Sequence, residues 1–254
     1  ADLRAAFGPV IDRLAKNGID LTKRGIEVSP IAHYHMGGVR VDVRMATAVP
    51  GLYGAGEAVG GANGANRLSG NALSEAFVFG ERAGRFAAEE VANLESGWSE
   101  EAAAAALDEI VASRNVSATE SGPGLSGMLV ELQELMWQDV GLVRTQGQLD
   151  SALARVREMR AEIGERPVES DHRFALSMQD WFDMRNSLMI AETIIIGAQI
   201  RKESRGAHQR GDFPFTNPSL EHNLVTRLDG DGFTVERVAL VAKSYDLVPL
   251  EAAE

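Results

Sequence analysis

Residues 51–80 read GLYGAGEAVGGANGANRLSGNALSEAFVFG, and this stretch decides the fold of the chain. It opens with a short apolar run that is typical of the end of a strand, and then becomes a loop crowded with glycine. An amphipathic helix follows, with apolar residues at helical spacing from Leu73 onward. Ser69 or Asn71 is expected to cap this helix. Strand, glycine-rich loop and helix N-terminus together make a place where backbone amides can face an anionic ligand.

Two interpretations of this loop compete. Gly54, Gly56 and Gly60 resemble a dinucleotide-binding fingerprint, but the third glycine comes one place late, so the match is weak. The loop could instead be a long surface connection. Its many glycines, combined with Arg67 and several asparagines, favour a loop built for the close approach of a ligand to the backbone.

Composition limits the possible functions. The 254 residues are enough for one large domain or two modest ones, and 44% hydrophobic residues support a globular core. The absence of cysteine excludes a disulfide framework, iron–sulfur ligation and a thiolate zinc site in this chain. The net charge of -12 argues against nucleic acid or an anionic membrane surface as a direct partner. Because the sequence starts at Ala1 without an initiator methionine, we expect a fragment of a longer protein.

A second motif, HYHMGG, occupies residues 33–38. His33 and His35 would lie on one face of a strand and could in principle chelate a metal ion. No third ligand lies nearby in the sequence, so we predict no metal site, and a core or surface histidine pair is the alternative. Gly37 and Gly38 would let the backbone approach a ligand without a side-chain clash.

These motifs resemble the flavoprotein subunits of the succinate dehydrogenase/fumarate reductase family. The matching blocks are HYHMGG (residues 33–38), GLYGAGE (51–57), GANRLSGNALSE (64–75), WQDVGLVRT (137–145) and ESRGAHQRGDFP (203–214). The resemblance covers nearly the whole chain but only the C-terminal part of the family's length. Asn63 departs from the family, which often has histidine there, and this difference would remove a polar or titratable group near the site. Ala72 stands where serine is frequent.

The resemblance implies FAD as the cofactor and a dicarboxylate as the substrate. His33 corresponds to a histidine that holds one substrate carboxylate, and Arg67 to an arginine that binds the substrate, for which a planar guanidinium is well suited. Glu57 matches the glutamate that accepts hydrogen bonds from the ribose hydroxyls of FAD. Ala72 and Leu73 match the pair whose backbone meets the pyrimidine end of the flavin. The family's proton-donating arginine would lie upstream, so no catalytic residue is assigned within this chain.

The expected fold class is α+β and mostly helical. It comprises the C-terminal portion of an FAD-binding α/β domain, a three-helix bundle and a small terminal β segment. The expected domains are residues 1–30 (end of a capping domain), 31–98 (FAD-binding domain) and 99–254 (helical domain with terminal strands). Helices are predicted over residues 2–17, 99–116, 128–143, 148–163 and 174–202, and strands over 26–28, 39–43, 233–241 and 247–250. The charged block of residues 201–214 is expected to be a structural salt-bridge network, with contact to the flavin domain as the alternative.

The implied function is part of an FAD-dependent oxidoreductase that interconverts succinate and fumarate, in electron transport and the tricarboxylic acid cycle. An iron–sulfur protein subunit would carry the electrons onward. We expect a cytoplasmic protein, with the option of a peripheral position at the cytoplasmic face of the inner membrane through partner subunits. The alternatives are an L-aspartate oxidase, which tends to have cysteine in place of Met36, a soluble fumarate reductase, and a non-catalytic helical docking module. The chain by itself is expected to bind FAD weakly and to be inactive.

Overall fold

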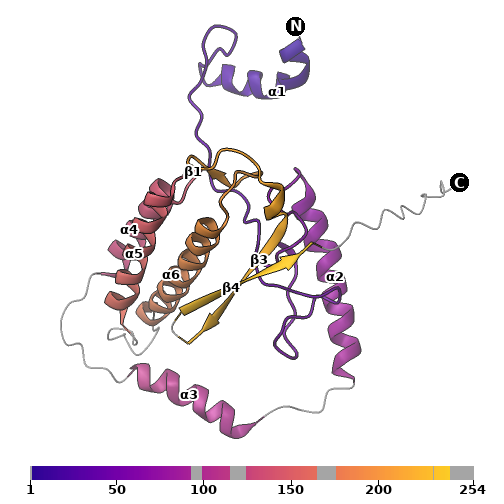
Figure 1. Ribbon diagram of the computed structural model, residues 1–254. Coiled ribbons are helices and arrows are strands. Elements are labelled where there is room, and N and C mark those ends of the chain that lie inside the picture. Colours follow the sequence, from indigo (N-terminus) through magenta and orange to yellow (C-terminus); the bar gives the residue numbers. More distant parts are fainter. Residues whose placement is uncertain (1, 93–98, 115–123, 165–175, 231, 241–254) are drawn as a thin grey trace, which may run out of the picture. The chain divides into compact units, whose positions relative to one another are not determined.

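The structure is a computed structural model that describes residues 2–92, 99–114, 124–164, 176–230 and 232–240 (Figure 1). The fold is α+β and mostly helical, as predicted. Contacts divide the chain into two compact units, residues 1–35 and 36–254, which are described separately. Within the described ranges, no helix combines the length and the apolar character needed to cross a membrane. The domain boundaries at residues 30 and 98 stay predictions.

The first unit contains helix α1 (Asp2–Lys16), in agreement with the predicted helix. The backbone leaves helical geometry at Phe7 (φ -125°, ψ 20°), just before Pro9. Proline lacks an amide donor and its ring crowds the preceding turn, which explains the kink. The helix ends at Lys16, and Gly18, two residues later, has a left-handed φ of 76°. The strand predicted at residues 26–28 is wrong, because this segment has no regular structure and Val28 is 80% exposed.

The second unit begins with irregular chain rather than the strand predicted over residues 39–43. Only Val39 is paired there, in a single parallel bridge to Val59. The chain turns immediately afterward, because one carboxylate oxygen of Asp42 accepts hydrogen bonds from the amides of Arg44 (2.8 Å) and Ala46 (3.0 Å). A side chain that captures local amides offers the backbone an alternative to a strand ladder, and the alternating valines do not overcome it.

Helix α2 (Asn71–Val91) follows the glycine-rich loop and packs against the short 3-10 helix η1 (Gly56–Ala58). Helix α3 (Glu100–Arg114) comes next in the sequence. Gly56 is buried at the contact of η1 with α2, where an added Cβ would lie 3.7 Å from the Cα of Ala76. The expected order of glycine-rich segment and amphipathic helix is therefore present.

Helices α4 (Leu125–Asp139), α5 (Gln146–Ile163) and α6 (Leu176–Ile200) form the predicted three-helix bundle (Figure 1). Their buried apolar side chains make the core of the unit: Met128, Leu132, Val140, Leu149, Ala152, Val156, Met159, Met184, Leu188, Ala191, Ile195 and Ala198. Thr145 and Gln148 form a capping box that starts α5. The buried Glu192 of α6 pairs with Arg157 and Arg160 of α5, which satisfies its charge inside the bundle.

Two small sheets complete the second unit. Strand β1 (Val143–Arg144) pairs in parallel with β2 (Gln209–Arg210). After the 3-10 helix η2 (Pro218–Leu220), β3 (His222–Asp229) pairs antiparallel with β4 (Gly232–Ala239). The terminal strand predicted from residue 233 is thus present as β4, whereas its partner strand β3 was not predicted from the sequence. The strand predicted at residues 247–250 lies outside the described residues.

Candidate functional site

Arg67 lies in the loop of residues 60–70, which connects η1 to α2, and its side chain is half-buried. The loop has no regular structure and is held by local turns, such as the hydrogen bond from the amide of Asn66 to the carbonyl of Asn63 (3.3 Å). A contact at Ala65 also ties it to a distant segment, because the amide of Ala207 donates to the carbonyl of Ala65 at 2.8 Å. The position of Arg67 therefore depends on these contacts of the loop.

Asn63 connects the loop to α2. Its side-chain amide donates a hydrogen bond of 2.7 Å to Glu75, a carboxylate that is only 7% exposed. Glu75 was given no role from the sequence, because it lies off the apolar stripe of this helix. The stripe residues Leu73 and Phe77 are 68% and 76% exposed, so helical periodicity carried no signal for the burial of Glu75. Asn63, which replaces a frequent family histidine, thus keeps a polar donor at this position and lacks only the titratable group.

Helix α2 begins without a side-chain cap, so the predicted caps Ser69 and Asn71 are wrong. Gly70 is the N-cap residue, with a left-handed φ of 92°, and glycine has no side chain to accept a hydrogen bond from the first turn. The amide of Leu73 donates instead to the carbonyl of Gly70 (3.2 Å). Ala72 is half-buried, whereas the side chain of Leu73 is 68% exposed. Their predicted backbone contact with flavin stays a prediction, and their place in the first turn is compatible with it.

Glu57 and His33 occupy exposed positions. Glu57 lies in η1, just after Gly56, whose φ of 71° is left-handed. His33 belongs to the first unit and lies in an irregular segment, whereas Arg67 and Glu57 belong to the second unit. Glu57, Arg67 and Ala72 therefore lie in one unit, on η1, on the connecting loop and on α2, and η1 packs against α2. The meeting of His33 with Arg67 stays a prediction.

Gly38 has a structural role that sequence analysis did not foresee. It has a φ of 137°, and an added Cβ would lie 2.4 Å from the carbonyl oxygen of Ala58. The amide of Val39 donates to this same oxygen at 2.9 Å, and the amide of Gly60 donates to the carbonyl of Val39 at 3.1 Å. The backbone of the second motif therefore packs directly on the glycine-rich stretch, which requires glycine at position 38 whatever ligand is nearby.

The charged block of residues 201–214 is organised around two ion-pair centres. In the first, Glu203 is fully buried and accepts hydrogen bonds from Arg201 (2.8 Å), from Arg205 (2.9 and 3.1 Å) and from the amide of Asn217 (2.9 Å). Burial raises the pKa of this carboxyl, but the bonds from Arg205, Asn217 and Arg201 together outweigh burial and lower the pKa to about 2. This centre confirms the predicted salt-bridge network.

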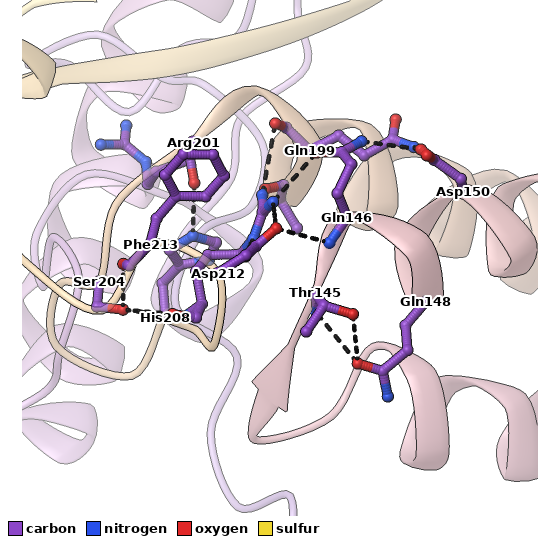
Figure 2. Close-up of polar contacts among 12 residues, drawn as sticks. Thr145, Gln146, Gln148, Asp150, Gln199, Arg201, Ser204, His208, Asp212 and Phe213 are labelled. Atoms are coloured by element: carbon purple, nitrogen blue, oxygen red, sulfur yellow. Dashed lines mark hydrogen bonds and ion pairs between the residues drawn. The ribbon is translucent and has the colours of Figure 1, made fainter.

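The second centre is Arg210, whose side chain is 1% exposed. It binds both carboxylate oxygens of Asp212 at 2.8 Å and the carbonyl of Ala198 at 2.7 Å. Asp212 also accepts a hydrogen bond of 2.8 Å from the amide of Gln146 at the start of α5 (Figure 2). The bonds from Arg210 lower the pKa of Asp212. Arg210 therefore ties the end of α6 to the start of α5 through a bidentate pair.

His208 lies beside these centres, with its ring Nε2 2.9 Å from the carbonyl oxygen of Arg201 (Figure 2). Burial lowers its pKa, and Arg144, Arg201 and Arg210 add to this effect by repelling a positive charge on the ring. An imidazole with a lowered pKa stays neutral around pH 7, so His208 adds no further positive charge to this arginine-rich region.

The depressed pKa of Glu203 predicts an acid-sensitive stability. A carboxyl whose pKa is near 4.5 when unfolded and about 2 when folded stabilises the protein fully above pH 4.5. This contribution is lost as the pH falls from 4.5 to 2, because the unfolded chain then binds more protons than the folded one. We expect Glu203→Gln to flatten the dependence of the unfolding midpoint on pH between 5 and 2.5. Equal slopes for the variant and the parent protein in thermal unfolding would contradict the assignment.

Comparisons with known proteins find matches to an N-terminal and to a C-terminal stretch of the chain. A family model described as FAD binding domain matches residues 2–73, and one described as fumarate reductase flavoprotein C-term matches residues 130–248. A fumarate reductase (CoM/CoB) chain of Methanothermobacter marburgensis is 36% identical over 82% of this chain and 37% of its own length. L-aspartate oxidase of Pseudomonas aeruginosa is 34% identical over 90% of this chain and 40% of its own length.

A solved structure agrees with these matches. The Sdh1 complex of Mycobacterium smegmatis in the apo form contains a chain that is similar with a TM-score of 0.80 and 32% identity. The similarity covers 95% of this chain and 42% of that one. The chain thus spans about two-fifths of the length of the curated relatives that it matches.

Proposed function

The chain belongs to the succinate dehydrogenase/fumarate reductase flavoprotein family, whose cofactor is FAD, and on this premise we propose that it supplies part of a dicarboxylate site beside the flavin. The whole protein would interconvert succinate and fumarate. The observation that carries the proposal is the placement of Arg67: a half-buried arginine on a glycine-rich loop directly before the α2 N-terminus.

The residues present fit an FAD site. The α2 N-terminus has no side-chain cap, so its first-turn amides can face the negative charge of a reduced flavin without competition from a serine or asparagine oxygen. Ala72 would contact the flavin through its backbone, as would Leu73, and the exposed carboxylate of Glu57 would accept the ribose hydroxyls. When bound, FAD supplies a ring that exchanges a hydride with the substrate.

In this proposal the substrate is held by its two carboxylates. Arg67 would bind one of them through two parallel hydrogen bonds, and His33 would donate a hydrogen bond to the other. Two fixed anchors orient a small diacid, and a cationic donor near a carboxylate stabilises the negative charge that develops on it as hydride adds to the double bond. The proton would come from a group outside this chain, because no residue here is assigned to donate it.

We also propose that an iron–sulfur protein is the electron-transfer partner. The chain has no cysteine, so it cannot hold an iron–sulfur cluster of its own. The similar chain of M. smegmatis belongs to a complex, which supports an assembled enzyme. The proposed location is the cytoplasm or the cytoplasmic face of the inner membrane, with any membrane association made by partner subunits.

L-aspartate oxidase is the second candidate function. The oxidase of P. aeruginosa is 34% identical to this chain, nearly the same as the fumarate reductase relative at 36%. Met36 favours the succinate/fumarate assignment, since the aspartate oxidases tend to have cysteine there. The Arg210–Asp212 pair favours it too, because the last motif of the aspartate oxidases differs at these positions.

Parallel assays of the full-length protein separate the two functions. We expect fumarate-dependent oxidation of a reduced viologen dye and no aspartate-dependent release of peroxide, because Met36 and the last motif favour the succinate/fumarate assignment. The flavin content of each preparation, read from its absorbance, is the control for occupancy. Peroxide release with aspartate, in a preparation that does not reduce fumarate, would assign the protein to the aspartate oxidases instead.

A further inference from the structure

The turn of residues 204–208, here called the clamp turn, contacts the loop that carries Arg67. The amide of Ala207 donates a hydrogen bond of 2.8 Å to the carbonyl oxygen of Ala65. Gly206, with a φ of 57°, approaches the same residue so closely that an added Cβ would lie 2.3 Å from that oxygen and 3.0 Å from the Cβ of Ala65. Ala65 precedes Arg67 by two residues, so the contact acts on the backbone of the loop close to Arg67 in the sequence.

The clamp turn is the more strongly fixed of the two segments. Arg205 and His208 close it with paired backbone hydrogen bonds of 2.8 and 3.0 Å. Its base is buried: Glu203 accepts the four bonds described above, and the hydroxyl of Ser204 donates to the carbonyl of Phe213 (2.9 Å) and accepts from the amide of Arg210 (2.9 Å). Figure 2 shows the bond between Ser204 and Phe213.

The Arg67 loop, by contrast, has glycine at positions 60, 61, 64 and 70 and no regular structure. Glycine-rich backbone loses much conformational entropy when it is ordered, so it needs external contacts to keep one conformation. The tip of the clamp turn, Gly206 and Ala207, is exposed, but its base at Glu203 and Ser204 is buried and hydrogen-bonded. A turn anchored in this way sets the conformation of the glycine-rich loop rather than the reverse.

We propose that Gly206 and Ala207 are positioning residues that hold the Arg67 loop in the conformation in which its guanidinium binds a substrate carboxylate. The helical C-terminal segment would then take part in substrate binding without contacting the substrate. The expected effect on catalysis rests on the proposed function, whereas the contact between the clamp turn and the Arg67 loop does not. Misplacement of a binding group by about 1 Å is enough to lose on the order of 100-fold in rate.

The test is Gly206→Ala in the full-length protein, with Gly230→Ala as the matched control. Gly230 has a φ of 60°, so alanine brings the same left-handed strain there, but its added Cβ would meet no atom within 4 Å. We expect Gly206→Ala to raise KM for fumarate about tenfold or more with a smaller change in kcat, at full flavin content. Gly230→Ala should leave KM unchanged.

Gly206→Asn provides a second variant if Gly206→Ala folds poorly. Asparagine tolerates the left-handed region better than alanine, yet it keeps the Cβ that meets Ala65. The proposal predicts that it also raises KM. An unchanged KM in both Gly206 variants, at full flavin content, would overturn the positioning role.

Hydrogen exchange separates this inference from the proposed function. If Gly206→Ala speeds amide exchange in residues 61–69 at least tenfold more than Gly230→Ala does, the clamp turn holds the loop. Equal exchange in the two variants would refute the contact. Hydrogen exchange needs no substrate, so it tests whether the clamp turn holds the Arg67 loop even if the parent protein does not act on fumarate.

Discussion

Replacing Arg67 with lysine in the full-length protein is expected to lower kcat/KM for fumarate about 10²–10³-fold, at unchanged flavin content. Lysine keeps the positive charge but loses the planar fork that binds a carboxylate through two parallel hydrogen bonds. Steady-state kinetics with a reduced dye as electron donor measures the effect.

Arg227→Lys is the matched control for this variant. Arg227 lies on β3, is 54% exposed and approaches Glu236 at 3.9 Å. The same change of side chain there should leave kcat/KM within about twofold, since surface ion pairs contribute little. If Arg67→Lys were equally harmless, the guanidinium would not be a substrate ligand, and the proposed dicarboxylate site would be wrong in its main residue.

Glu203→Gln should destabilise the protein by about 3–5 kcal/mol, the usual cost of breaking a buried ion pair from one side. The carboxylate is fully buried and is the shared acceptor for Arg201 and Arg205, whose side chains are 17% and 28% exposed. Glutamine has the same shape, but its amide group would point donors at two guanidinium groups and leave their charges without compensation. The apparent midpoint of thermal unfolding of the full-length protein, with helical content followed by circular dichroism, should fall by several degrees.

Glu131→Gln is the control for this change. Glu131 accepts two hydrogen bonds from Arg155, at 2.5 and 3.0 Å, but its side chain is 46% exposed. Loss of an exposed pair costs about 1 kcal/mol or less, so the midpoint should barely move. Similar losses for Glu203→Gln and Glu131→Gln would mean that burial of Glu203 adds nothing to the ion-pair network.

The helical bundle was predictable because its signal is local. Apolar side chains recur at helical spacing in each of its helices, and this periodicity survives in the folded core, where Leu149, Val156 and Leu188 are fully buried. The cap of α5 is equally local, since Thr145 and Gln148 sit three residues apart and satisfy each other. Such features need no knowledge of distant segments.

The irregular parts were predicted less well, because there a local feature of the chain competes with the propensity of the residues. The valines at residues 39–43 alternate like a strand, but Asp42 captures the amides of Arg44 and Ala46 and turns the chain away. At the start of α2, serine and asparagine were available as caps, yet the left-handed Gly70 took that position. In the first place local hydrogen bonds of Asp42, and in the second the left-handed backbone of Gly70, outweighed the propensity of the residues.

The sequence by itself determined the family, the cofactor, the helical bundle and the list of site candidates, since motifs and helical periodicity are written along the chain. Only the tertiary structure decided what lies beside the Arg67 loop. Gly206 and Ala207 reach Ala65 across more than 130 residues of sequence, and Gly38 reaches Ala58 through backbone contact. Backbone atoms are the same in every residue, so contacts between them leave no mark in the sequence except a glycine, and a glycine does not say which segment it touches.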